Sequence, residues 1–281
     1  MIARRRAAER VSDGVPGFDK TGKMRPAIPN AIRCFLLALI CAVPVAQSTG
    51  TSAIVLRSRA RIVLAADSRV VYSANQGATE CKLFEIRDVY ATVSGLAHYG
   101  SSFRATDAIR DGFAMSGSFP DHITATAFSL QRRIGKLLAS LQQNNPSAYR
   151  LLLQRSSRPS DFIQLAVAQA VNGQPMLGII ELRRISGEPS FTVRTTICPG
   201  NCGRDSGIFY LGYWERIQPY VADSGQPRTI ASAASIDRLI RMEIGAHPAE
   251  VGTPINILEL NGSGARWLQN GGNCTLPGVR G

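Results

Sequence analysis

Short runs of apolar, β-branched residues recur along the chain and are separated by polar turns. The runs 53–56 and 62–66 flank the cationic segment 57–61, a pattern typical of a β-hairpin with a solvated tip. The same pattern predicts further strands at residues 82–86, 89–94, 162–171, 176–184, 191–197, 208–212, 254–260 and 265–268. Because most of these strands arrive in adjacent pairs, we expect neighbours in the chain to pair in antiparallel fashion.

Three segments instead space their apolar residues three and four positions apart, which indicates amphipathic helices. They cover residues 103–115, 123–141 and about 229–245. Two antiparallel sheets packed face to face, with helices over both outer faces, would bury every apolar stripe. We therefore predict an α/β (α+β) fold, a four-layer αββα sandwich. A doubly wound parallel sheet is disfavoured, because it needs a helix between nearly every pair of strands.

The apolar run 34–46 follows Arg33 and precedes small polar residues, which fits the hydrophobic core of a secretory signal peptide. It is shorter than the roughly 20 residues of a membrane span, so no stable span is expected after its removal. Met24 would open a signal peptide of ordinary length, so both Met1 and Met24 are candidate start residues.

Small residues at Ala46 and Ser48, or at Ser48 and Gly50, fit the preference of a processing site. The second choice would expose Thr51 as the first residue of the mature chain. We therefore predict two parts, a leader over residues 1–50 and one domain over residues 51–281.

The net charge of +12 is scattered rather than clustered. Residues 1–50 contain eight Lys and Arg against three Asp and Glu, which leaves +7 for residues 51–281. Nucleic-acid binding is disfavoured, because the chain has neither a long basic run nor the aromatic platforms that stack on bases.

Of the six cysteines, the four that follow the leader are Cys81, Cys198, Cys202 and Cys274. An even number suits disulfides in an oxidising compartment, and we predict a secreted or periplasmic protein, or a cytoplasmic one if the leader is only a propeptide. Cys198 and Cys202 could close a small loop and leave Cys81 to pair with Cys274, although four cysteines allow three pairings.

Residues 51–69, TSAIVLRSRARIVLAADSR, resemble the start of a mature proteasome β-type subunit, a member of the N-terminal nucleophile hydrolases. In that family the chain begins with Thr after a processed Gly, and the second strand ends in Ala-Ala-Asp-Ser/Thr-Arg. Here Gly50-Thr51 and residues 65–69 stand at the corresponding spacing. The resemblance continues through residues 82–86 (KLFEI) and 93–95 (VSG), and beyond these only the order of elements is similar.

The resemblance implies a threonine-type amide hydrolase in which Thr51 is the nucleophile and its own α-amine is the general base. A free α-amine, whose pKa in short peptides is about 7.7 to 8.0, is partly neutral near pH 7 and can accept the hydroxyl proton. Asp67 would hold Lys82 charged beside the hydroxyl, and the Gly95 N–H would face the developing oxyanion. The expected supporting residues are Arg69 and Ser94.

Two later segments depart from the family pattern. The family has a Gly-Ser-Gly segment and an Asp-x-x-Ser-Gly-Gly segment, and this chain has Gly-Tyr-Trp at residues 212–214 and His-Pro-Ala-Glu-Val-Gly at residues 247–252. Neither serine is present, although Glu250 could replace one acceptor. The alternatives to a peptidase are therefore a small-molecule amidase and a non-catalytic binding or assembly module of the same fold.

Other chemistries have weaker support in the sequence. No bound metal is expected, because His98, His122 and His247 are isolated along the chain. No cofactor is expected either, since no phosphate-cradling glycine loop is present. Residues 205–207, Asp-Ser-Gly, are similar to part of a serine-protease nucleophile segment but have no His in a suggestive context. The expected partners are a peptide or amide substrate and further copies of this chain in a homo-oligomer.

Overall fold

The computed structural model describes residues 51–73, 76–155, 162–185, 190–203, 206–223, 232–276 and 279. All of them belong to the unit Pro44–Gly281. The predicted signal peptide, the two candidate start residues and the processing residue Gly50 lie outside the described residues, as does Asp205.

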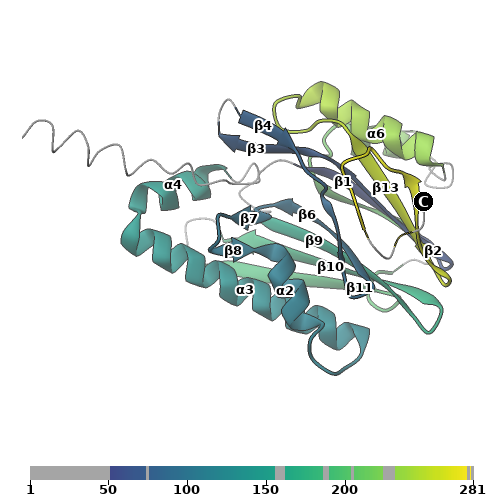
Figure 1. Ribbon diagram of the computed structural model, residues 1–281, viewed down its shortest axis with the longest axis horizontal. Coiled ribbons are helices and arrows are strands. Elements are labelled where there is room, and N and C mark those ends of the chain that lie inside the picture. Colours follow the sequence, from purple (N-terminus) through teal and green to yellow (C-terminus); the bar gives the residue numbers. More distant parts are fainter. Residues whose placement is uncertain are drawn as a thin grey trace, which may run out of the picture. The chain divides into compact units, whose positions relative to one another are not determined.

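The first sheet contains the strand that follows Thr51, and its strand order is β12-β1-β2-β13-β14 (Figure 1). Its strands are β1 (Ser52–Arg57), β2 (Arg61–Asp67), β12 (Gly207–Gly212), β13 (Ile255–Asn261) and β14 (Gly264–Gln269). All neighbouring strands are antiparallel, and Ala53 of β1 lies opposite both Leu211 of β12 and Ala66 of β2. The strand that begins directly after Thr51 is therefore an interior strand of the sheet.

The second sheet has the strand order β11-β10-β9-β6-β5 and is also antiparallel throughout. Its strands are β5 (Leu83–Ile86), β6 (Val89–Gly95), β9 (Ile163–Val171), β10 (Gln174–Arg184) and β11 (Phe191–Cys198). Every strand of both sheets coincides with a strand predicted from the sequence.

Helices cover the outer face of each sheet (Figure 1). The helices beside the second sheet are α2 (Ala105–Gly112), α3 (Phe119–Asn144) and α4 (Pro146–Arg155), and those beside the first are α5 (Ile217–Asp223) and α6 (Ala233–Ala246). α3 begins with a capping box, in which the Ser118 N–H donates to Asp121 Oδ2 over 2.9 Å.

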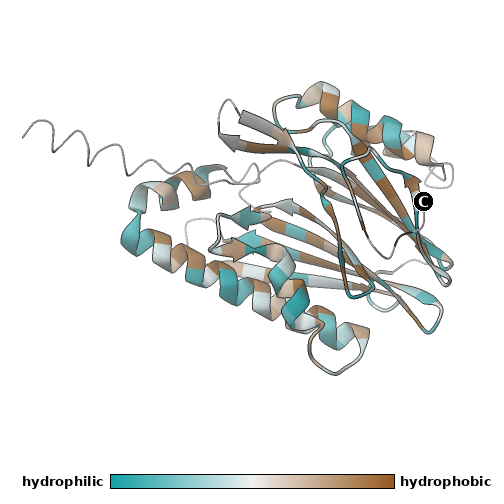
Figure 2. Ribbon diagram, viewed as in Figure 1, coloured by the Kyte–Doolittle hydropathy of each residue, from teal (hydrophilic) through white to brown (hydrophobic). Residues whose placement is uncertain are grey.

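Three hydrophobic clusters separate these layers and confirm the predicted four-layer αββα sandwich. On β1, Ile54 packs toward α6 together with Leu239, whereas its neighbour Val55 packs between the two sheets with Leu177. The third cluster joins α3 to the second sheet, and Ile123 is one of its members. Figure 2 shows hydrophobic residues along the strands of both sheets, while α3 and α6 mix hydrophobic and hydrophilic positions.

Several elements differ from the sequence prediction. The predicted helix 103–115 is wrong at its start, because Phe103–Arg104 form the short strand β8, which pairs with β7 (His98–Tyr99). The ribbon formed by β3 (Arg69–Ser73) and β4 (Gln76–Thr79) was not predicted. Helices α4 and α5 were not predicted either.

Both proposed disulfides are present, one between Cys81 and Cys274 and one between Cys198 and Cys202. The first connects the residue next to Lys82 with the C-terminal segment. Within the described ranges, no helix is both long enough and apolar enough to cross a bilayer.

Candidate active site

The centre of the candidate site is the carboxylate of Asp67, which ends β2 and is fully buried. Its Oδ1 accepts hydrogen bonds from Lys82 Nζ (2.9 Å) and from the Ser52 N–H (3.0 Å). Its Oδ2 accepts from the N–H groups of Arg69 and Gly252, both at 3.0 Å. Four donors thus stabilise one buried carboxylate, and they compensate for the water that it has lost.

Lys82 forms a buried ion pair with Asp67 just before β5 begins. Burial lowers the pKa of the Lys82 ammonium from its ordinary value of 10.5, and the attraction of Asp67 and the hydrogen bond to it oppose this shift. The lysine is therefore held at a fixed place by a charge partner, in surroundings where it releases its proton more readily than a free lysine.

Thr51 lies next to the Asp67–Lys82 ion pair, because its chain neighbour Ser52 binds Asp67. Only 3% of Thr51 is exposed, and its carbonyl oxygen accepts a hydrogen bond from the Tyr213 N–H over 2.9 Å. Ser52 also donates its hydroxyl to the Tyr213 carbonyl oxygen over 2.9 Å. Because the Ser52 amide and Lys82 share one oxygen of Asp67, the backbone at Thr51 is fixed beside the ion pair.

Ser94 and Gly95 approach the site from the other sheet, at the end of β6. Gly95 has a φ of +81°, and a Cβ there would overlap the carbonyl oxygen of Phe162, so this turn requires glycine. Ser94 Oγ and the Thr51 carbonyl oxygen both lie so close to Gly212 that a Cβ on Gly212 would overlap them. Thr51 and Ser94 therefore meet at Gly212, where the two sheets face each other.

The structure thus gathers five of the residues singled out from the sequence: Thr51, Asp67, Arg69, Lys82 and Ser94, with Gly95 adjoining Ser94. Arg69 contributes its backbone N–H, while its buried side-chain Nε has no hydrogen-bond partner within the described part of the chain.

The two segments that depart from the family pattern also reach the site. Tyr213 binds the Thr51 carbonyl and Gly252 binds Asp67, so both segments contribute backbone groups rather than the missing serine hydroxyls. The segments also contact each other, because the ring of Tyr213 packs against His247 with 4.4 Å between ring centroids.

Two buried amides near the site were missed by the sequence analysis. Gln164 on β9 accepts from the Gly212 N–H over 2.8 Å, and Asn256 on β13 donates to Ser68 Oγ over 2.9 Å. Both side chains are buried and interrupt otherwise apolar strands. A polar residue inside an apolar run is a usable indication of such a role, since a buried amide needs hydrogen-bond partners.

A cavity of about 440 Å³ adjoins Lys82. Its lining residues are Val70, Glu80, Cys81, Lys82, Phe84, Val93, Ala97, His98, Arg104 and Thr106. Burial is the main factor that lowers the pKa of His98 below the ordinary value of 6.5, which favours the neutral imidazole at neutral pH. The cavity therefore combines an apolar wall with a few polar side chains, as small-molecule and side-chain pockets do.

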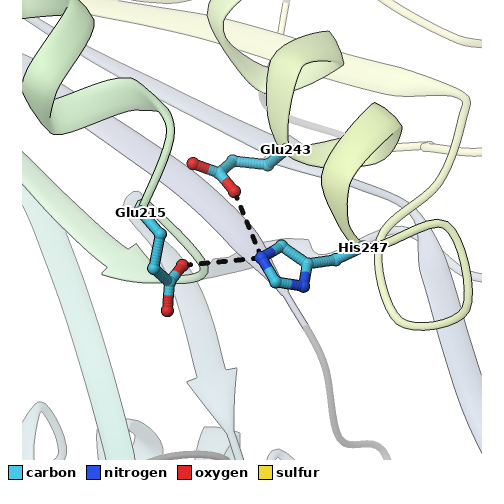
Figure 3. Close-up of side chains that lie close together, drawn as sticks. All are labelled: Glu215, Glu243 and His247. Carbon is cyan, nitrogen blue, oxygen red and sulfur yellow. Dashed lines mark ion pairs between the residues drawn. The ribbon is translucent and has the colours of Figure 1, made fainter.

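A second polar cluster surrounds His247, whose ring packs against Tyr213. His247 was expected to be isolated, and this is wrong, because Glu215 and Glu243 lie beside it (Figure 3). Glu243 precedes His247 by one helical turn, whereas Glu215 reaches it only through the fold. Within the described ranges these three residues are a candidate metal-binding group.

Comparisons with protein-family models and with curated protein sequences found no match. The structure is similar to solved structures of low sequence identity. Anbu (ancestral beta-subunit) from Yersinia bercovieri is 13% identical, with a TM-score of 0.49 over 77% of this chain and 86% of that chain. The Anbu (Gly-1) mutant from Hyphomicrobium sp. strain MC1 is 16% identical, with a TM-score of 0.47 over 75% of this chain and 82% of that chain.

A third similar structure is Thiobacillus denitrificans BPH in complex with epoxomicin. It is 13% identical, with a TM-score of 0.42 over 75% of this chain and 98% of that chain. At such identities the likeness concerns the fold, which the layers and strand order described above establish independently.

Proposed function

We propose that the protein is an amide hydrolase that uses Thr51 as an N-terminal nucleophile after removal of residues 1–50. The observation that supports this best is the buried Asp67 carboxylate, which binds both Lys82 and the amide that follows Thr51. A buried ion pair contributes little to stability, and a role in chemistry explains its position beside Ser52 better.

In the proposed reaction, Thr51 Oγ1 attacks the carbonyl carbon of the substrate amide while the Thr51 α-amine accepts the hydroxyl proton. The positive charge of Lys82 favours the alkoxide form of the hydroxyl. The amine then transfers the proton to the leaving nitrogen as the C–N bond breaks. Water then attacks the carbonyl carbon of the resulting ester, the bond from this carbon to Thr51 Oγ1 breaks, and the acyl group leaves as a carboxylic acid while a proton from the water returns to Oγ1.

The developing oxyanion would be bound by the Gly95 N–H. The left-handed conformation of Gly95 turns the chain at the end of β6, beside Ser94 and Gly212. A single donor of this kind commonly contributes about 3 to 4 kcal/mol to the lowering of the barrier. Gly95 is therefore a proposed catalytic residue that acts through its backbone, and Ser94 and Arg69 are proposed positioning residues.

Peptides are the proposed substrates, and the cavity beside Lys82 is the proposed place for a substrate side chain. Its apolar wall, with Val70 and Phe84, suits an aliphatic or aromatic group. Glu80 and Arg104 on the same lining would bind a polar end of that group. A small-molecule amidase would use the same chemistry, and comparing short peptides with simple acyl amides as substrates distinguishes the two.

The test is a comparison of the wild type with Thr51→Ala and Thr51→Ser in purified, tag-free protein. Thr51→Ala should lose all amidase activity, since no hydroxyl remains, whereas Thr51→Ser should retain a reduced rate. Intact mass spectrometry should show that the active wild type begins at Thr51. An unchanged rate in Thr51→Ala, or active protein that still carries residues before Thr51, would contradict the proposal.

A non-catalytic binding or assembly module is the second candidate. The specific observation in its favour is that Tyr213 and His247 pack together where the family has hydroxyl-bearing segments. This candidate predicts a correctly processed wild type with no turnover of any peptide or acyl amide, and a Thr51→Ala variant that is indistinguishable from it.

We also infer export to a secreted or periplasmic compartment and assembly into a homo-oligomer. Two disulfides in the described chain are compatible with an oxidising compartment. The exposed side chains of Phe128 on α3 and Met115 after α2 would suit a contact between copies. Light scattering on a size-exclusion column tests this assembly, and a monomer at micromolar concentration would contradict it.

A further inference from the structure

Three ligand-type side chains, Glu215, Glu243 and His247, point toward one another from two segments of the chain (Figure 3). Glu215 lies between β12 and α5, Glu243 lies in the last turn of α6, and His247 follows that helix. His247 Nε2 is 3.7 Å from Glu243 Oε2 and 3.8 Å from Glu215 Oε2. One ligand atom of each residue lies within 4.8 Å of the others.

Glu243 carries the observation that points to a ligand. Its side chain has no exposed surface, and its Oε1 accepts from the N–H groups of Arg216 (2.6 Å) and Ile217 (3.0 Å). Its Oε2, by contrast, is buried and has no hydrogen-bond partner in the described part of the chain. A buried carboxylate oxygen without a partner is costly, and this one is directed at His247.

A protonated His247 does not satisfy this oxygen. The two nitrogen–oxygen distances exceed the range of a hydrogen bond, and one N–H would have to serve two carboxylates. A shared cation fits better, because two ligands bound at about 2.0 to 2.1 Å to a tetrahedral metal lie about 3.4 Å apart. The two distances from His247 Nε2 to the carboxylate oxygens, 3.7 and 3.8 Å, are close to this value, and all three ligand atoms lie within 4.8 Å of one another.

Charge and access agree with a divalent ion. Two carboxylates supply two negative charges, and an imidazole adds a neutral ligand. The side chains of Glu215 and His247 are 45% and 30% exposed, so an ion can enter and water can complete its coordination. The imidazole favours a transition metal over Mg²⁺ or Ca²⁺, which prefer oxygen ligands.

We propose that Glu215, Glu243 and His247 bind one divalent transition-metal ion, with Zn²⁺ as the first candidate. The ion would connect the segment after β12 to the end of α6. The first segment binds Thr51 through the Tyr213 N–H, and the chain that follows α6 binds Asp67 through the Gly252 N–H. The metal would therefore stabilise both segments without being part of the proposed catalytic centre. Metal binding is measurable through stability and does not depend on the proposed hydrolase activity.

The experiment is thermal unfolding of tag-free protein in chelator-free buffer, with and without ZnCl₂, together with calorimetric titration. Zn²⁺ should raise the melting temperature of the wild type and bind with a stoichiometry of one ion per chain. Glu215→Gln, Glu243→Gln and His247→Gln should each abolish or greatly weaken both effects. Glu85→Gln, the same chemical change on β5 of the other sheet, should leave them intact.

Glu215→Gln is the decisive variant, because its exposed side chain leaves folding largely unaffected and Glu243→Gln could destabilise α6. An equal effect of Zn²⁺ on Glu215→Gln and on the wild type would overturn the site. The absence of any shift or binding heat at millimolar ZnCl₂ in the wild type would overturn it as well. A shift with CaCl₂ but none with ZnCl₂ or MnCl₂ would overturn the assignment to a transition metal.

Discussion

At the scale of single residues, the candidate site contains two groups, the Asp67 carboxylate and the Gly212 backbone, that are fixed by hydrogen bonds or by close packing. Asp67 binds two donors on each oxygen, so its carboxylate has one orientation. Gly212 is equally constrained, because its φ of +74° and its contact with Thr51 leave no room for a side chain. Close approach of the backbone, rather than chain flexibility, explains the glycine at this position.

Replacing Gly212 with alanine should therefore destabilise the protein strongly. The left-handed backbone alone costs about 1 to 2 kcal/mol, and the overlap with Thr51 and Ser94 should raise the loss to more than about 3 kcal/mol. Gly173→Ala is the matched control, because its φ of +75° is nearly the same and a Cβ there would meet open space. Urea unfolding measures both variants, and equal losses would contradict the steric account.

At the scale of elements, one carboxylate connects the helices that cover the second sheet. Asp111 at the end of α2 accepts from Ser129 Oγ (2.6 Å) and from Arg133 Nη2 (2.7 Å), both on α3. The Ser129 hydroxyl, followed by Arg133, holds the pKa of Asp111 below its ordinary value of 3.8. The folded state therefore favours the ionised carboxylate more than the unfolded chain does.

Asp111→Asn should lower the free energy of unfolding by about 1 kcal/mol at neutral pH. Because the folded pKa is depressed, this contribution is present above pH 3.8 and is lost as the pH falls through the folded pKa. The difference between variant and wild type should then shrink in acid. Urea unfolding at several pH values measures it, with Asp88→Asn in the exposed β5–β6 turn as a control that should change little.

Helices and strands were predicted correctly from the sequence where their apolar residues recur at regular intervals or form a continuous run. All strands of the two sheets were predicted, because each shows apolar alternation or a continuous apolar run. The β3–β4 ribbon pairs only with itself, and its apolar run, residues 70–72, is only three residues long. Helix α5 has seven residues and contains Pro219, which normally indicates a break in a helical pattern, and α4 has only ten residues.

The residues of the candidate site were predicted only where they belong to short sequence motifs near the ends of strands. Asp67 ends β2, and Ser94 is the last residue but one of β6 in the other sheet; the place of each strand follows from its apolar run. Gln164 and Glu215 reach their partners over 48 and 32 positions of the chain, so no local pattern indicates these contacts. Such tertiary contacts depend on register and sheet packing, which sequence periodicity leaves undetermined.

At the scale of the whole molecule, the Cys81–Cys274 disulfide spans 193 positions and holds the C-terminal segment beside Lys82. Cys81→Ser combined with Cys274→Ser should lower the free energy of unfolding by about 2 to 5 kcal/mol. The double variant Cys198→Ser and Cys202→Ser is the control, because its bridge spans only 4 positions. Closing so short a loop restricts the unfolded chain less, and the entropic stabilisation of the folded state is about 3 kcal/mol smaller than for the long bridge.

Thermal unfolding of oxidised protein measures both double variants. The loss of the long bridge should lower the melting temperature more, and it should also reduce the proposed amidase activity, because Cys81 adjoins Lys82. A larger loss from the short bridge would contradict this expectation.

The hydrogen-bonded ladder of β1 begins at Ser52, opposite Gly212, and Asp67 is bound through the Ser52 amide. A cut in front of Thr51 therefore breaks none of these bonds. If residues 1–50 are removed as proposed, the precursor would be able to form both sheets before the cleavage and to remain folded but inactive. Maturation would then require no refolding, only the hydrolysis of the peptide bond between Gly50 and Thr51 in a protein that is already folded.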